Sequence, residues 1–354
     1  MDECSPLETE YRAGIRRRYI LATALAVVAV AVAAVSIFCS RFSTLNPSVT
    51  WDILSVHLSG GTYPDYYENL IVWEMYVPRA ILGVVAGAGL AVAGVVMQSL
   101  LRNPLAEPYT TGVASGASFG AALYIMLGIS IIPVDDYNLG LTINASILAL
   151  VPTFAILAIS QRRSITPTTM ILAGIAVMYV FRAATSLMTL YADPEAVESL
   201  YMWNVGTVGS ARWDNIWIIA GSTLIGIILL WVLSHQVTMM TAGENSAKSM
   251  GVRTRLVRMV CLVIIAIMTA VIVGYCGTIG FMGLVAPHIA RILVGSNLKR
   301  LLPCSAAVGA AVLVICDLIA KMASDTMHVG VITAIIGGPI FIMLLIKGAR
   351  KVWY

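Results

Sequence analysis

The sequence predicts an all-α membrane protein, a single bundle of about ten transmembrane helices. Of its 354 residues, 59% are apolar and only 11% are charged, whereas a soluble domain carries about 25% charged residues. Apolar runs follow one another along nearly the whole chain, and a run of roughly 20 residues is long enough to cross a bilayer. Lys and Arg gather in alternate connections, which fixes one orientation of the bundle.

Ten segments carry this signal. We expect helices at about 18–40, 78–100, 112–132, 142–160, 168–191, 215–234, 258–276, 280–294, 304–322 and 330–347. The first apolar stretch is too long for a cleaved signal peptide and no small-residue cleavage site follows it. The eighth span is short and is interrupted by Gly283 and Pro287.

The charges place both termini in the cytoplasm. Cytoplasmic loops hold the excess of Lys and Arg, and with the N terminus inside most of the cations fall there, while the outer segments keep Arg41, Arg79, Arg212 and Lys321. Acidic residues lean outward. We therefore expect a cytoplasmic N-terminal segment, 1–17, and one transmembrane domain, 18–354. A polar cytoplasmic segment lies at about 241–258, and the protein is expected in the plasma membrane.

The sequence contains no pattern typical of a catalytic, metal-binding or nucleic-acid-binding site. The six cysteines form no C-x-x-C pair, and we interpret them as small apolar packing residues. The spans contain no paired carboxylates, H-E-x-x-H or Ser/His/Asp cluster, and the net charge is only +4. We expect no catalytic residue, no metal site and no bound cofactor.

The polar stretch at 241–258 has the length and the Lys248-Ser249 pair of a phosphate-binding loop. Such a loop needs glycines, so that backbone N–H groups reach the phosphates, and a preceding strand. Here both glycine positions are alanine, Ala242 and Ala247, and an apolar span precedes them. We expect instead a short surface helix that ends at Gly251. It is either an ordinary solvated turn or a docking element for a cytoplasmic partner.

Several long motifs resemble those of a known family. These are P-R at 78–79, Q-x-x-x-R-N-P-L-A at 98–106, G-F-x-G-L-x-x-P-H-x-x-R at 280–291 and G-x-P-x-F at 337–341. From about residue 50 onward the chain is similar to the FecCD family. Its members are permease subunits of ABC importers of the type II class, which carry iron–siderophore chelates, haem or vitamin B12.

The resemblance implies partners. A second permease copy, two ATP-binding subunits on the cytoplasmic side and an extracytoplasmic binding protein are expected, besides membrane lipid; ATP binds only to the partner subunit. It also implies that 241–258 docks on the ATPase, with Glu244, Asn245, Ala247, Lys248, Gly251 and Val252 as coupling residues.

The same resemblance implies an outer docking surface for the binding protein, with Arg79 and Lys321 as its cations. The family's R-x-P-R reads Tyr76-Val77-Pro78-Arg79 here, so tyrosine stands at the first arginine. An alternative for Lys321 is an i, i+4 pair with Asp317.

Within the spans, Gly83 and Gly87 on the second helix, and Gly112, Gly116 and Gly120 on the third, are expected to let helices pack closely. Residues 101–108 are expected to form a tight inner connection. Pro287 and His288 are predicted to mark a helix break, with His288 either capping the freed carbonyl or belonging to a moving bend.

Arg182 lies in the middle of the fifth span. A charge at that depth is costly and faces a polar cavity or a partner. It either pairs inside the bundle or faces the central pathway and attracts an anionic substrate.

Three functions suit a chain of this kind: an ABC permease subunit, an ion-gradient-driven secondary transporter, and a membrane enzyme. Secondary transporters place carboxylates at mid-membrane near broken helices, and the sequence shows almost none there. The resemblance implies the first function, for an iron chelate, haem or cobalamin, and the lack of such carboxylates agrees with it.

Overall fold

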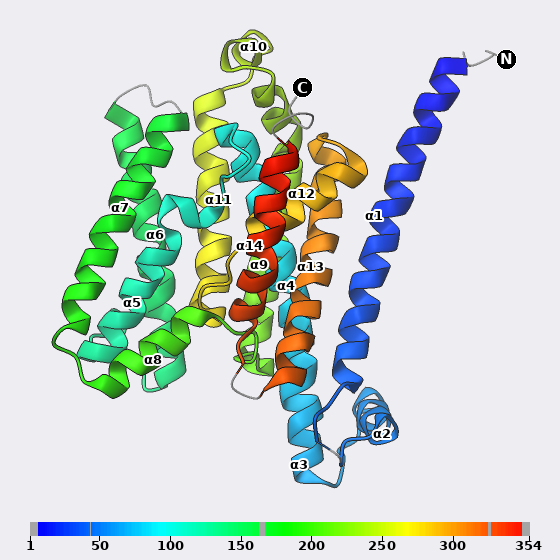
Figure 1. Ribbon diagram of the computed structural model, residues 1–354, viewed down its shortest axis with the longest axis vertical. Coiled ribbons are helices and arrows are strands. Elements are labelled where there is room, and N and C mark those ends of the chain that lie inside the picture. Colours follow the sequence, from blue (N-terminus) through cyan, green and yellow to red (C-terminus); the bar gives the residue numbers. More distant parts are fainter. Residues whose placement is uncertain (1–5, 43, 163–166, 325–326, 349–354) are drawn as a thin grey trace.

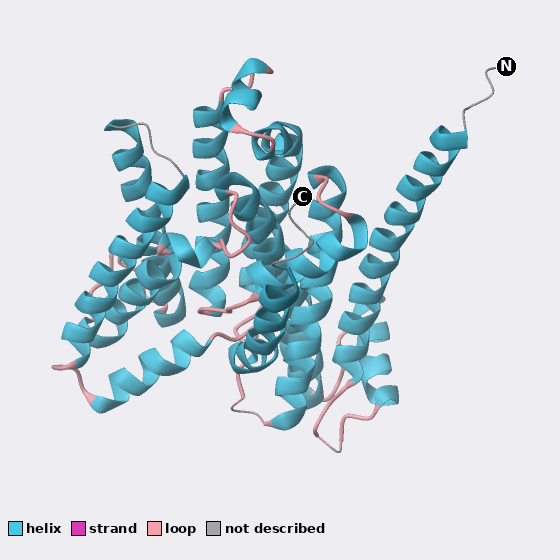
Figure 2. Ribbon diagram, turned by 45° about the horizontal axis from the view of Figure 1, so that its top comes forward, coloured by secondary structure: helices cyan, strands magenta, loops and turns pink. Residues whose placement is uncertain are grey.

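The structure is a computed structural model that describes residues 6–42, 44–162, 167–324 and 327–348. All regular secondary structure in these ranges is helical (Figure 2). The first helix begins at Pro6, so the part of the expected segment 1–17 that is described continues directly into the first span. Residues 1–5 of that segment lie outside the described residues.

Each of the ten predicted spans corresponds to a helix. They are α1 (Pro6–Phe38), α4 (Val77–Leu101), α5 (Val113–Leu127), α6 (Tyr137–Arg162), α7 (Pro167–Thr189), α9 (Trp213–Thr241), α11 (Thr254–Cys276), α12 (Met282–Val294), α13 (Leu298–Ala323) and α14 (Val329–Gly348). Seven helical stretches are long and apolar enough to cross a membrane, and three shorter apolar helices lie in α5, α12 and α14. The prediction of ten helices is confirmed.

Six short helical segments connect these helices. They are α2 (Pro47–Leu58), α3 (Tyr66–Asn69), the π-helical η1 (Leu70–Tyr76), the 3-10 helix η2 (Pro108–Thr111), α8 (Pro194–Val205) and α10 (Glu244–Ser249). Figure 1 shows α2, α3 and α8 at one end of the bundle. The other end holds α10 together with the start of α1 and the end of α14, which agrees with both termini lying on the basic, cytoplasmic side.

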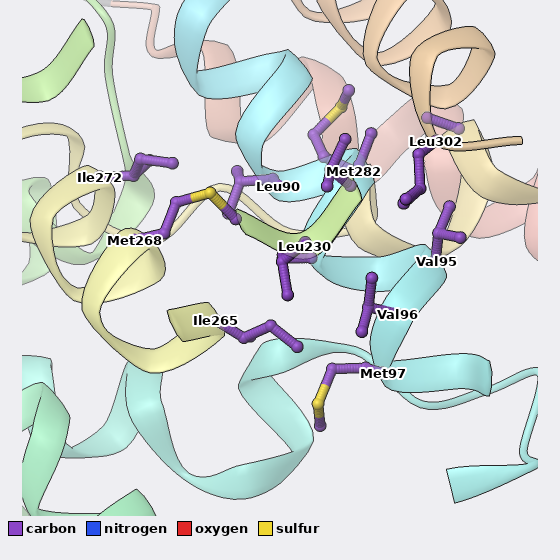
Figure 3. Packing of buried hydrophobic residues seen from close by; sticks show 14 of the residues in the cluster. Leu90, Val95, Val96, Met97, Leu230, Ile265, Met268, Ile272, Met282 and Leu302 are labelled. Atoms are coloured by element: carbon purple, nitrogen blue, oxygen red, sulfur yellow. The ribbon is translucent and has the colours of Figure 1, made fainter. Parts of the chain in front are cut away.

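Helix α4 forms the centre of the bundle. Nearly all of its residues from Ala86 to Leu101 are buried, whereas most membrane helices keep a lipid-facing side. Figure 3 shows its side chains Leu90, Val96 and Met97 meeting residues of α9 and α11. Because α4 is covered on all sides, its apolar runs serve helix packing and not contact with lipid.

Glycines bring α4 into backbone contact with two neighbours. A Cβ atom on Gly87 would collide with the carbonyl oxygen of Gly309 in α13, and one on Gly94 would collide with that of Gly283 in α12. Such close approach strengthens dispersion contacts where no hydrophobic drive acts between helices. The packing role predicted for Gly87 is confirmed.

Helices α5 and α6 pack in the same way. Cβ atoms on Gly116 and Gly120 would collide with the carbonyls of Leu148 and Asn144 on α6, so the predicted packing role of these glycines is also confirmed. Gly112 differs, because it precedes α5 with a φ of 90°, a left-handed conformation that glycine adopts without strain.

The outer end of α4 is tied to α13 by an ion pair. Arg79 donates to Asp317 from Nε at 2.9 Å and from Nη2 at 2.8 Å. The Asp317 side chain is 6% exposed and that of Arg79 is 20% exposed. Two parallel hydrogen bonds of this kind add geometric specificity to the charge attraction.

Replacing one partner of this pair should destabilise the protein strongly. Arg79→Gln leaves the Asp317 carboxylate buried without its cation, so we expect the unfolding free energy to fall by about 3 kcal/mol. Arg79→Gln/Asp317→Asn should recover most of that loss. The measurement is denaturant or thermal unfolding of the purified chain in detergent.

The matched control is Lys248→Gln, which breaks the exposed i, i+4 pair with Glu244. Exposed pairs contribute at most about 1 kcal/mol. Equal destabilisation by Arg79→Gln and Lys248→Gln would contradict a buried, structural ion pair at Arg79.

Candidate functional site

The polar segment at 241–258 folds as predicted into a short surface helix, α10. Its end is a Schellman motif, because the N–H of Val252 bonds to the carbonyl of Ala247 and the N–H of Gly251 to that of Lys248. Gly251 has a φ of 82°, the left-handed conformation that this motif places after a helix. The chain therefore turns sharply from α10 into α11.

Three contacts fix α10 against the bundle. Ala247 is completely buried, and Glu244 binds Lys248 at 3.2 Å and Arg258 of α11 at 3.3 Å. Partial burial by itself raises the pKa of the Glu244 carboxyl, but the hydrogen bond from Lys248 and the charge of Arg258 outweigh it and hold that pKa below its ordinary value. Glu244 is thus ionised near neutral pH, which keeps both ion pairs formed.

The six predicted coupling residues fall into two groups. Glu244 and Ala247 face the bundle and position α10, whereas Asn245, Lys248 and Gly251 are exposed at its surface; Val252 is half-buried. The prediction did not include Met250, which is 51% exposed next to Gly251. An exposed large apolar side chain on a polar segment is the signal that could have found it.

The predicted helix break at Pro287 is wrong. Helix α12 runs without interruption through Pro287. The span is instead interrupted before α12, at residues 277–281, where Gly277 and Phe281 both have a φ of 67°. A proline removes one N–H from the helix, and the carbonyl that this leaves over, that of Gly283, accepts a hydrogen bond from Gln98 of α4 at 3.1 Å.

His288 does not cap that carbonyl. Its Nδ1 atom contacts the carbonyl of Leu284 in its own helix at 2.9 Å. Gln98 performs the capping role and in turn accepts a hydrogen bond from Arg291 at 3.1 Å. A side chain from another helix can satisfy the carbonyl just as well, so the local sequence around Pro287 could not reveal it.

Residues 101–108 were predicted to form a tight inner connection, but the chain returns into the bundle. Arg102 stays at the inner end, where it donates to the carbonyl of Met240. Farther along, a Cβ atom on Gly283 would lie 3.3 Å from the Cβ of Glu107 and 3.4 Å from the carbonyl of Leu90, in the middle of α4. The hydroxyl of Tyr109 then accepts the N–H of Ile279 at 3.2 Å.

Glu107 is therefore a half-buried carboxylate at the depth of the middle of α4. Glu107 lies outside the apolar spans, so its position in the sequence does not directly indicate a carboxylate at this depth. Pro104 and Pro108 on either side of Glu107 mark a segment that cannot be helical throughout, and this was the available signal.

Arg182 lies on the exposed surface of α7. This excludes the interpretation that its side chain is enclosed within the bundle of a single chain. Only 11% of the α7 span is buried, the lowest share among the seven long spans. Because an arginine in hydrocarbon is costly, lipid alone is an unfavourable neighbour for this face.

The two outer cations proposed for docking are both engaged within the chain. Arg79 holds Asp317, so the carboxylate that i, i+4 spacing offers to Lys321 is bound by another residue. The Nζ atom of Lys321 donates to the carbonyl of Ser36 in α1 and lies 3.9 Å from the centre of the Tyr76 ring. Tyr76, at the family's arginine position, thus forms a cation–π contact.

Comparison with known proteins agrees with this architecture. The FecCD transport family matches residues 25–347. The cobalamin import permease BtuC of Halobacterium salinarum is 32% identical over 335 residues, which cover 94% of this chain and 89% of that protein. The Fe(3+)-citrate import permease YfmD of Bacillus subtilis is 35% identical over 283 residues, 79% of this chain and 83% of that protein.

A solved structure described as a metal-chelate type ABC transporter in an inward-facing conformation matches with a TM-score of 0.78. Its sequence is 28% identical, and the match covers 93% of this chain and 99% of that chain. With its ten membrane helices, its surface helix α10 and this family match, the chain belongs to the FecCD family of ABC transporter permeases and is a multi-pass protein of the plasma membrane.

Proposed function

We propose that the chain is the membrane-spanning subunit of an ATP-driven importer for an iron chelate, haem or cobalamin. The observation that carries the proposal is α10, a short helix that protrudes at the basic end of the bundle (Figure 1) and is held by Ala247 and the Glu244–Arg258 ion pair. A rigidly mounted helix can transmit a push from a separate ATPase into α11. The segment lacks the glycines of a phosphate loop, which supports a separate subunit as the site of ATP hydrolysis.

A second permease copy would complete the transporter. Helix α7 leaves most of its surface uncovered, and an exposed arginine on that surface disfavours lipid as its only neighbour. Two copies facing each other across α7 would enclose a central pathway. Cargo delivered by a binding protein from outside would pass along it while α7, α12 and α14 shift.

Arg79 and Lys321 remain our candidates for the docking surface. An acidic side chain on a binding protein would have to compete with Asp317 for Arg79. The single variant Asp317→Asn tests this, because it releases Arg79 and should bind the cognate binding protein more tightly. Equal binding by Asp317→Asn and Arg79→Gln would remove Arg79 from the docking surface.

Transport itself should depend on ATP. The permease and its ATPase are reconstituted in liposomes with ATP inside, the binding protein is outside, and labelled ferric siderophore, haem and cobalamin are offered in parallel. We expect ATP-dependent accumulation of one cargo, and none with an ATPase that binds but does not hydrolyse ATP.

The same assay addresses the ion-gradient-driven alternative, which Glu107 favours because secondary transporters use carboxylates at mid-membrane. Accumulation driven by a proton or sodium gradient without ATP would overturn the proposed function. Loss of that uptake in Glu107→Gln would then identify the coupling carboxylate.

Enlarging the exposed face of α10 should uncouple the transporter. Asn245→Trp places a bulky ring where we propose that α10 enters a cleft on the ATPase. We expect affinity for the ATPase to fall about tenfold, which corresponds to ~1.4 kcal/mol, with uptake falling in parallel. Asn245→Ala, which adds no volume, should bind the ATPase within about twofold of the unchanged protein. Normal affinity and uptake with Asn245→Trp would exclude α10 as the contact.

Arg182 should select anionic cargo. Arg182→Gln removes a charge that we place on the pathway, so uptake of an anionic chelate should fall by roughly tenfold, the equivalent of ~1.4 kcal/mol. Uptake of a neutral chelate should not change, and Arg182→Lys should keep part of the anionic uptake. Equal loss for anionic and neutral cargo would point to a packing role for Arg182 at the interface between copies.

A further inference from the structure

A groove opens at the cytoplasmic end of the chain, between α10 and the first turns of α11. Its volume is about 460 Å³. Three cationic and three apolar side chains line it, and we call them its rim and its floor: Lys248, Arg253 and Arg255, and Val252, Leu256 and Met259. The groove is thus cationic at the end of the bundle and apolar on the side of the membrane.

The apolar floor continues along α11 toward the middle of the membrane. Leu256, Val260 and Ile267 are 49%, 39% and 46% exposed, and the half-buried Val263 lies between the last two. Steps of four, three and four residues keep these side chains on one face of a helix. They form an exposed apolar stripe that begins in the groove and runs down α11.

Of the three cations that line the groove, Lys248 forms an ion pair with Glu244. Glu244 is the acidic residue that faces this rim from α10, and it is already engaged by Lys248 and by Arg258 of α11. Arg253 is exposed at the junction of α10 and α11. An anion that enters the groove therefore meets cations from both helices.

We propose that this groove binds the headgroup of an anionic phospholipid of the cytoplasmic leaflet, with one acyl chain along the α11 stripe. Basic pockets at the cytoplasmic ends of membrane helices attract anionic headgroups. A soluble phosphate would use only the cationic rim and would leave the apolar stripe without a function. An acidic segment of the ATPase would likewise leave the stripe uncovered, because the stripe runs into the membrane.

The position of the site gives the lipid a role in coupling. Lys248 belongs to α10, and Val252 directly follows the Schellman turn that ends it. A headgroup bound to both α10 and α11 would hold α10 at a fixed height above the membrane surface. Anionic lipid would therefore favour productive docking of the ATPase without touching the transport pathway.

The test measures lipid binding directly and needs no transport. The full-length chain, alone and in complex with its ATPase, is titrated with phosphatidylglycerol and with phosphatidylcholine, and bound lipids are counted by native mass spectrometry. We expect preferential binding of phosphatidylglycerol in both forms. Arg253→Gln should weaken it about fivefold, the loss of one juxtamembrane cation.

Lys299→Gln is the matched control, since Lys299 is an exposed cation at the same end of the chain, in α13. It should leave lipid binding unchanged. Equal affinity of Arg253→Gln and the unchanged protein for phosphatidylglycerol would overturn the proposal.

Two further outcomes would also reject it. Glycerol 1-phosphate competing as strongly as phosphatidylglycerol would show a site for a free anion. Loss of lipid binding on addition of the ATPase, with Arg253→Gln weakening only the ATPase complex, would assign the groove to that subunit.

Discussion

The close backbone contact of α4 with α12 and α13 is the constraint on which the rest of the structure depends. Gly94 lies against the carbonyl of Gly283, and Gly87 against that of Gly309, so any side chain at these positions of α4 would push its neighbours away. In a bilayer, helices are held by dispersion and a few polar contacts, because lipid tails are as apolar as the side chains. Direct backbone contact between the helices strengthens both the dispersion attraction and these polar contacts. It also places Gln98 where it can reach the carbonyl of Gly283.

Satisfying that carbonyl makes a proline-containing half-helix possible inside the bundle. Backbone polar groups at membrane depth need partners within the protein, and irregular backbone is tolerated where protein covers it. The interrupted segment before α12 follows the same rule, since Tyr109 accepts the N–H of Ile279 and Thr278 donates to the carbonyl of Asn204. Helix α11 connects α10 directly to this irregular segment, which lies beside α8 and α14. Motion imposed on α10 would reach this irregular segment through α11.

The sequence could predict those features that depend on local pattern. Ten apolar runs, the basic cytoplasmic connections and the glycine spacing of α5 all led to correct elements, because length, charge and helical period are local properties. The ending of α10 at Gly251 was predictable for the same reason. The prediction of a break at Pro287 failed because the effect of a proline on a helix depends on which group binds the freed carbonyl. Here the carbonyl of Gly283 is bound by Gln98, 185 residues away in the sequence. Glu107 was missed because a polar connection can fold back into the bundle without any change in its composition.

By itself the sequence determined that the chain crosses the membrane with its basic segments inside, since the transfer of apolar and charged groups into hydrocarbon is decided residue by residue. Tertiary structure alone decided which charged side chains are engaged within the chain and which remain exposed for a partner. The sequence does not show the partners of Arg79 and Lys321, which the structure gives as Asp317 for Arg79, and as Ser36 and Tyr76 for Lys321. Arg182 instead lies on an exposed face of α7. The physical reason is that a charge inside a membrane protein is stabilised by its partner, and that partner comes from another helix.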